Sequence, residues 1–124
     1  MTNQFLLYAG AAFVAFWGIA HLFPTKNIVA GFGDISEDNK NIITMEWIIE
    51  GVSMIFIGVL VTTVTLIDHT SPVSIAVFWI TFGGLNILSA VALFTGFRVN
   101  FLPFKLCPLI LTTASIMILL GVLL

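Results

Sequence analysis

The chain is 124 residues long, 60% hydrophobic and 8% charged, with a mean hydropathy of +1.17. An ordinary soluble domain carries about 25% charged residues, so this composition leaves too few charges to cover a soluble surface. Four Lys and Arg against six Asp and Glu provide no basic footprint for nucleic acid, and the apolar content excludes intrinsic disorder. The composition therefore predicts an integral membrane protein whose main partner is the lipid bilayer.

Four apolar runs follow one another along the chain. They cover 5–23, 42–67, 73–94 and 106–124. A helix needs about 20 mostly apolar residues to cross a bilayer, and it satisfies its own backbone hydrogen bonds there. The many short alternating segments of a β-barrel are not present. We therefore predict an all-α, polytopic membrane protein, a single four-transmembrane-helix bundle over 1–124 with no room for a soluble domain.

The second helix is predicted to begin before its apolar run. Ser36 is a favourable N-cap, and Glu37 and Asp38 place negative charge at the positive end of the helix dipole. A helix from Glu37 to about Leu66 is roughly 45 Å long at 1.5 Å per residue. It is therefore expected to protrude into the headgroups or to tilt.

The basic residues predict the orientation of the chain. Lys and Arg occupy only the first and third connections, 24–41 and 95–105, at Lys26, Lys40, Arg98 and Lys105. With four spans these two connections lie on one side, and the positive-inside rule places them in the cytoplasm. We therefore expect a multi-pass protein of the cell inner membrane with both termini extracytoplasmic.

Two acids share one face of the second helix. Glu46 and Glu50 are four residues apart, and Ser53 continues the same face. Glu46 adjoins Trp47, an interfacial anchor, where its carboxylate can reach water. Glu50 lies about two turns into the apolar run, where a carboxylate is costly. It is either a functional group or a neutral acid hydrogen-bonded between helices.

Two further polar residues lie at the same predicted depth. His21 lies two residues before the end of the first helix, and Gly18 on its face favours close approach of another helix. If that helix is the second, His21 meets Glu46 or Glu50; otherwise His21 is an interfacial residue. Asn86, flanked by small residues in the third helix, provides either an interhelical hydrogen bond or a substrate contact.

These residues form one predicted site on the cytoplasmic side. The candidate catalytic residues are Glu50 and His21. The candidate ligand-binding residues are Glu46, Glu50, His21, Asn86, Ser53 and Trp47.

Metal and haem sites are not predicted. His69 lies in the outer turn, nearly one bilayer from His21, so the two cannot both ligate one iron within a chain. The run Asp34-x-Ser36-x-Asp38 lacks the glycine of a calcium loop, and the single Cys107 cannot form an internal disulfide. The cofactor, if there is one, stays unassigned.

The sequence His21-Leu22-Phe23-Pro24 closes the first predicted helix, and a long connection precedes an acidic second helix. This layout resembles DoxX-like small four-helix bacterial membrane proteins over most of the chain in hydropathy. Such families include subunits assigned to quinone-linked oxidoreductases, so the resemblance implies a bacterial membrane protein and includes quinones among the expected ligands. It carries over no catalytic residue. The types Glu, His, Asn and Trp are also similar to those in the pocket of membrane sterol isomerases, with different spacing.

Three functions remain open from the sequence. The first is a binding or accessory module that holds a lipid, quinone or other apolar ligand in a cytoplasmic-leaflet pocket. The second is a membrane enzyme that uses Glu50 and His21 in acid–base chemistry, with Asn86 orienting the substrate. The third is an oligomeric proton-coupled carrier with Glu50 as the protonation site. A homo-oligomer or a partner in a membrane complex is compatible with each.

Overall fold

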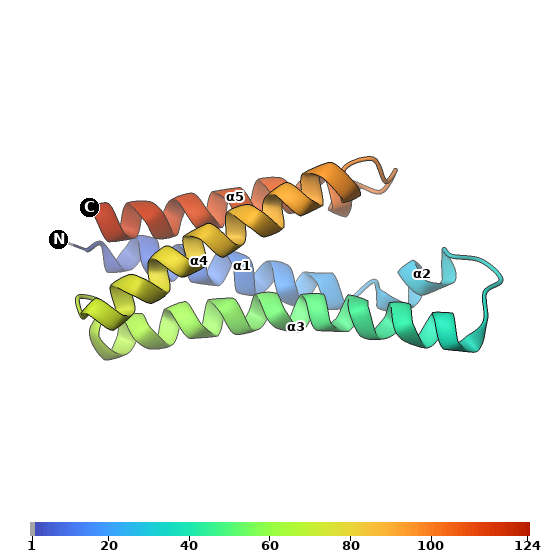
Figure 1. The fold of residues 1–124 in the computed structure, drawn as a ribbon, viewed down its shortest axis with the longest axis horizontal. Helices are drawn as coiled ribbons and strands as arrows, with labels where there is room; N and C mark the ends of the chain where they lie inside the picture. Colours follow the sequence, from blue (N-terminus) through green and yellow to red (C-terminus); the bar gives the residue numbers. More distant parts are fainter. Residues whose placement is uncertain (1) are drawn as a thin grey trace.

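The computed structural model describes residues 2–124, and within them it contains helices and no strand. The elements in chain order are α1 (Gln4–Leu22), α2 (Thr25–Ala30), α3 (Glu37–Asp68), α4 (Pro72–Val91), η1 (Ala92–Gly96) and α5 (Leu102–Leu123). Four of these helical segments, with η1 continuing α4, are long and apolar enough to cross a membrane. The prediction of an all-α four-helix membrane bundle is confirmed (Figure 1).

Both termini and the α3–α4 turn gather at one end of the bundle (Figure 1). The Asn3 amide donates to the Gly121 carbonyl at 2.7 Å, and the Gln4 side chain donates to His69 Nε2 at 3.0 Å. Gln4 begins α1 and His21 nearly ends it, about 26 Å away along the helix axis at 1.5 Å per residue. The two histidines therefore lie at opposite ends of the bundle, as the sequence predicted.

Serine N-caps mark the beginnings of α3 and α4. Ser36 accepts a hydrogen bond from the Asn39 amide at 3.2 Å, so α3 begins at Glu37 as predicted. Ser71 accepts from the Ser74 amide at 3.1 Å at the start of α4. Each cap satisfies an amide that has no partner within its helix.

The two basic connections are more helical than the sequence predicted. The short helix α2 occupies part of 24–41 and packs on the first turns of α3. η1 is a π-helical turn in which the Phe97 amide donates to the Ala92 carbonyl at 3.0 Å. α5 begins at Leu102, four residues before the apolar run, because Pro103 at the helix start needs no hydrogen-bond acceptor. The third connection therefore shrinks to 97–101.

Glycines bring the backbones of α1 and α3 into direct contact. A Cβ added to Gly58 would lie 2.6 Å from the Ala11 carbonyl oxygen, and one added to Gly18 would lie 2.6 Å from the Gly51 carbonyl oxygen. At such short distances only the hydrogen atom of a glycine fits, and any larger side chain would collide with the facing backbone. The expectation that Gly18 permits close approach of another helix is confirmed, and that helix is α3. This contact sets the register of α1 against α3.

The four spans form an open arrangement. α1 packs between α3 and α5, and α5 packs between α1 and α4. α3 and α4 are joined by a short turn and diverge from it, so they contact each other only sparingly (Figure 1). The buried core lies among all four, and its largest fully buried side chains include Leu7, Val14, Val61, Phe78, Leu85 and Ile118.

Candidate functional site

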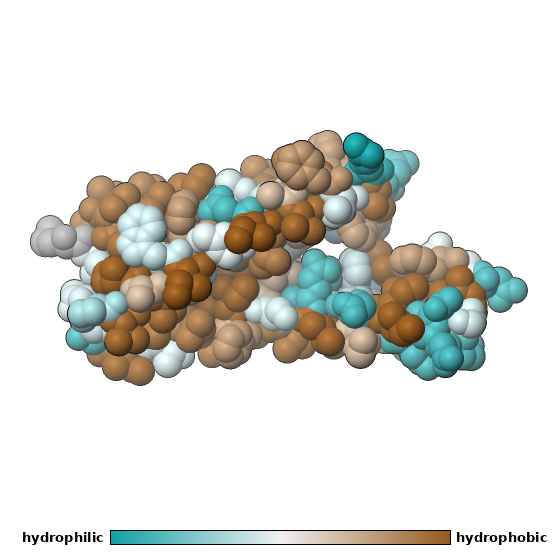
Figure 2. All heavy atoms as spheres, in the orientation of Figure 1, coloured by the Kyte–Doolittle hydropathy of each residue, from teal (hydrophilic) through white to brown (hydrophobic). Residues whose placement is uncertain are grey.

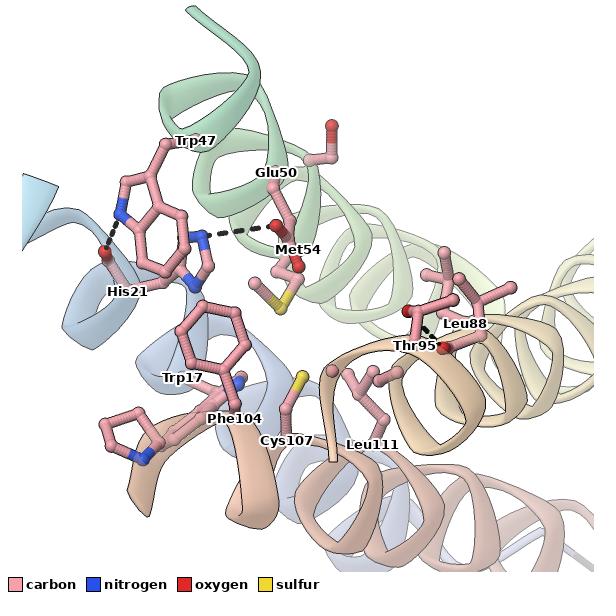
Figure 3. Close-up of a pocket in the computed structure, with 15 residues that line it drawn as sticks. Trp17, His21, Trp47, Glu50, Met54, Leu88, Thr95, Phe104, Cys107 and Leu111 are labelled. Atoms are coloured by element: carbon pink, nitrogen blue, oxygen red, sulfur yellow. Dashed lines mark hydrogen bonds and ion pairs between the residues drawn. The ribbon is translucent and has the colours of Figure 1, made fainter. Parts of the chain in front are cut away.

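A cavity of about 420 Å³ lies on the side where α3 and α4 have diverged (Figure 3). α1 contributes Trp17 and His21 to its wall, and α3 contributes Trp47, Glu50 and Ser53. Each of these five side chains carries a polar group, which in Trp17, His21 and Trp47 is part of an aromatic ring. The polar groups of a mostly apolar lining are therefore concentrated on α1 and α3.

The remaining walls are largely apolar. α4 and η1 contribute Leu88 and Thr95, and α5 contributes Phe104, Cys107 and Leu111. The wide π-helical turn places the end of the third span on the cavity wall, and such turns inside helices are frequent at functional sites. All four spans thus contribute to one cavity.

Trp47 holds the end of α1 in place. Its indole Nε1 donates to the His21 carbonyl at 2.8 Å, which satisfies a backbone oxygen that has no partner in the last turn of a helix. The Trp47 and His21 rings are stacked, with centroids 3.9 Å apart and an interplanar angle of 16°. Phe104 packs against Trp47 from α5 at 5.6 Å between ring centroids. The orientation of the His21 ring is therefore constrained on one face.

The ring of His21 faces Glu50. His21 Nε2 and Glu50 Oε2 are 3.4 Å apart, a distance typical of an ion pair, but without the geometry of a hydrogen bond (Figure 3). The His21 side chain is 9% exposed and that of Glu50 is 54% exposed. Of the two acids that the sequence offered to His21, the structure brings Glu50 to it.

Glu50 is level with His21, whose helix ends one residue later at Leu22. α3 begins 13 residues before Glu50, at Glu37, so its first turns extend beyond the end of α1 and pack against α2. Glu46 lies one turn farther out, is exposed, and does not line the cavity.

Asn86 is not brought to Glu50. Its amide nitrogen donates to the Phe82 carbonyl of its own helix at 2.7 Å, and the residue does not line the cavity. A Cβ on the neighbouring Gly83 would have no atom within 4 Å, so this face of α4 makes no close helix contact within residues 2–124. The polar contact from α4 comes instead from Ser89, which donates to the Pro108 carbonyl of α5 at 2.8 Å.

Two polar atoms on the cavity wall make no hydrogen bond. Among residues 2–124, the buried side-chain nitrogens and oxygens without a hydrogen bond are Thr2 Oγ1, Trp17 Nε1 and His21 Nε2. Buried polar groups are normally paired, and an unpaired one costs about 1–3 kcal/mol. Two of these three atoms line the same cavity, so the site offers unused hydrogen-bonding capacity.

Trp17 lines the cavity but was not among the candidate residues predicted from the sequence. The available signal was its spacing, because Trp17 lies four residues before His21 and therefore shares its helix face. Phe104 and Cys107 were missed as well, since they carry no polar pattern that distinguishes them from lipid-facing neighbours.

Comparisons of the chain with protein-family models, with curated proteins and with solved structures found no match, so the likeness to DoxX-like proteins stays a prediction.

Proposed function

We propose that this membrane protein is a binding or accessory module that holds an apolar ligand, such as a lipid or a quinone, in the cavity between α3 and α4. The observation that carries the proposal is the cavity itself, about 420 Å³ in volume, with two unpartnered polar atoms on its wall. Ligand sites commonly enclose about 300–1,000 Å³, with apolar and aromatic walls and a few polar groups that orient the ligand. The cavity has this composition.

The position of the cavity supports a ligand from the bilayer. Its walls include Ser53 on α3 and Leu88 on α4, the two spans that diverge. Figure 2 shows hydrophilic surface beside a hollow, with mostly hydrophobic surface on the adjoining parts of the molecule. A ligand dissolved in the bilayer can therefore reach the polar wall between two helices without crossing water.

The proposal is tested by mass spectrometry of the protein purified in a mild detergent and extracted with organic solvent. We expect one lipid class to be enriched at about one molecule per chain over a mock purification and over an unrelated four-span protein. A lipid profile identical to that of the unrelated protein in repeated preparations would contradict the proposal. The native Cys107 gives an independent readout, because an occupied cavity should slow its reaction with a membrane-soluble maleimide.

A second candidate function is favoured by the 3.4 Å approach of His21 and Glu50. A carboxylate beside an imidazole is a common acid–base pair, and both side chains line the cavity. The same purified protein separates the two functions. Turnover of a component of a lipid extract, lost in Glu50→Gln, would establish an enzyme, whereas bound lipid recovered unchanged supports the module.

A proton-coupled carrier has less support. Beyond the cavity, toward the α3–α4 turn, the buried side chains are mostly apolar, including Val61, Phe78 and Leu85. The buried hydroxyls of Thr65 and Ser74 there donate to backbone carbonyls. A single chain therefore offers protons no continuous polar route from Glu50 to the opposite end.

We also propose that the protein lies in the inner membrane with its basic connections in the cytoplasm. The orientation is tested by fusing two reporters to the chain. Alkaline phosphatase is active only outside the cytoplasm, and green fluorescent protein fluoresces inside it. We expect phosphatase activity and no fluorescence from fusions after Leu124. Fusions after Asp34, in the first connection, should give the reverse pattern. The opposite result at both sites would invert the proposed orientation.

A further inference from the structure

We infer that the ligand of this cavity is an uncharged lipid whose head carries a hydroxyl group. The inference rests on the proposed function and specifies the chemistry of the ligand. It depends on which hydrogen bonds the cavity wall can still make, and on the two ionisable side chains, Glu50 and His21, that the wall already holds.

The unpartnered atoms belong to one helix face. Trp17 and His21 are four residues apart in α1, so their side chains lie one turn from each other, with Cβ atoms about 5–6 Å apart. Both side chains line the cavity, and that of His21 is about nine-tenths buried. One small polar head group can therefore reach both side chains. Glu50 lies beside them, with its Oε2 atom 3.4 Å from His21 Nε2.

These three groups require a head that both donates and accepts. The indole Nε1–H of Trp17 can donate a hydrogen bond but cannot accept one. The Glu50 carboxylate, half exposed at the cavity, is an acceptor when ionised. His21 Nε2 provides a donor or an acceptor according to its tautomer. A hydroxyl can accept from Trp17 and donate to Glu50 or His21 at the same time.

Other head groups leave part of the wall unsatisfied. A carboxylate or phosphate would add an anion beside the Glu50 carboxyl group. Among residues 2–124, His21 is the only cavity-lining side chain able to carry a positive charge, and it already faces Glu50 at 3.4 Å. An ammonium group can pair with Glu50 but has no lone pair for the Trp17 N–H. A ketone or ester accepts from Trp17 and has no proton for Glu50. An alkane satisfies none of the three groups.

The level of the site fits an amphipathic lipid with a small head. His21 lies one residue from the end of α1, so the polar wall is near the bundle end that carries the basic connections. Apolar lining residues, including Met54, Leu88 and Leu111, border the rest of the cavity. The hydroxyl would stay near the membrane interface while the chain occupies the apolar part and the opening between α3 and α4.

The test uses five probes of equal chain length: a primary alcohol and the matched alkane, carboxylic acid, amine and methyl ketone. Binding of each radiolabelled probe is measured to the full-length protein in phosphatidylcholine nanodiscs, with empty nanodiscs as the background. We expect the alcohol to bind at least tenfold more tightly than each of the other four. Equal or tighter binding of any other probe overturns the inference but leaves the proposed function standing. If none of the five probes binds above the background of empty nanodiscs, the proposed function is contradicted as well.

Two variants connect the preference to the named residues. Trp17→Phe keeps the ring and removes the donor, so the ratio of alcohol to alkane binding should fall about tenfold; Trp79→Phe, on the exposed face of α4, is the matched control. Glu50→Gln replaces the carboxyl group by a neutral amide, so the carboxylic acid should bind several-fold more tightly than it binds to wild type. An unchanged ratio in Trp17→Phe, or unchanged acid binding in Glu50→Gln, overturns the assignment of these groups.

Discussion

Replacing Ser53 by tryptophan is expected to lower the amount of lipid that co-purifies with the protein at least tenfold. Ser53 lines the cavity from α3, and it is exposed, so its replacement disturbs no part of the buried core. An indole ring projecting from this position would occupy a large part of a cavity of about 420 Å³ and narrow the opening between α3 and α4. The measurement is quantitative mass spectrometry of the extracted lipid, normalised to protein.

Thr63→Trp is the matched control for this experiment. Thr63 lies on the same helix, is also exposed, and does not line the cavity. The Thr63→Trp variant should retain as much lipid as wild type, and circular dichroism should show equal helix content in the Ser53→Trp and Thr63→Trp variants. Full retention of lipid by Ser53→Trp would mean that the lipid binds on the outer surface of the bundle and not in the cavity.

Replacing Gly58 by leucine is expected to reduce the free energy of unfolding by about 3 kcal/mol, at the upper end of the usual cost of overpacking. A Cβ at this position would lie 2.6 Å from both the Ala11 carbonyl oxygen and the Ala15 Cβ. Backbone atoms cannot move aside as a flexible side chain can, so α1 and α3 must separate. Reversible unfolding in mixed micelles, followed by circular dichroism, measures the loss.

Gly84→Leu provides the comparison for the Gly58 variant. Gly84 is also in the middle of a span, and a Cβ there would have no atom within 4 Å. Leucine has a higher helix propensity than glycine, so this variant should be as stable as wild type or slightly more stable. Equal losses in both variants would show that the contact between α1 and α3 is not the cause.

The Gly58 variant should also weaken the site, because the same contact positions it. Gly18 packs against Gly51 one turn from His21, so separating α1 from α3 moves His21 away from Glu50. Lipid retention should therefore fall in Gly58→Leu and remain normal in Gly84→Leu.

Much of the fold could be predicted from the sequence because it depends on local properties. A long apolar run forms a helix in lipid since its backbone has no other hydrogen-bond partners there. The Ser36 cap and the acidic first turn of α3 are likewise local, and the structure begins that helix where they predicted. The ends of the third and fourth spans were harder to predict, because a π-helical turn and an early proline extend helices beyond their apolar runs.

The site could be predicted only in part. The candidates His21, Glu50, Trp47 and Ser53 line the cavity, and each drew attention as a polar or interfacial group in an apolar run. Glu46 and Asn86 had the same signal and lie elsewhere. Polarity alone could not separate these two groups, since it says nothing about how far one helix extends past its neighbour.

The sequence by itself determined that this chain forms four apolar helices with their basic connections on one side, because charge and hydropathy act residue by residue. Only the tertiary structure decided that Glu50 rather than Glu46 meets His21, and that Trp17 has an unused N–H on the same wall. Lipid is as apolar as a protein core, so every face of a membrane helix looks alike in hydropathy. The backbone contact at Gly18 and Gly51, and the divergence of α3 from α4, select the face that lines the cavity.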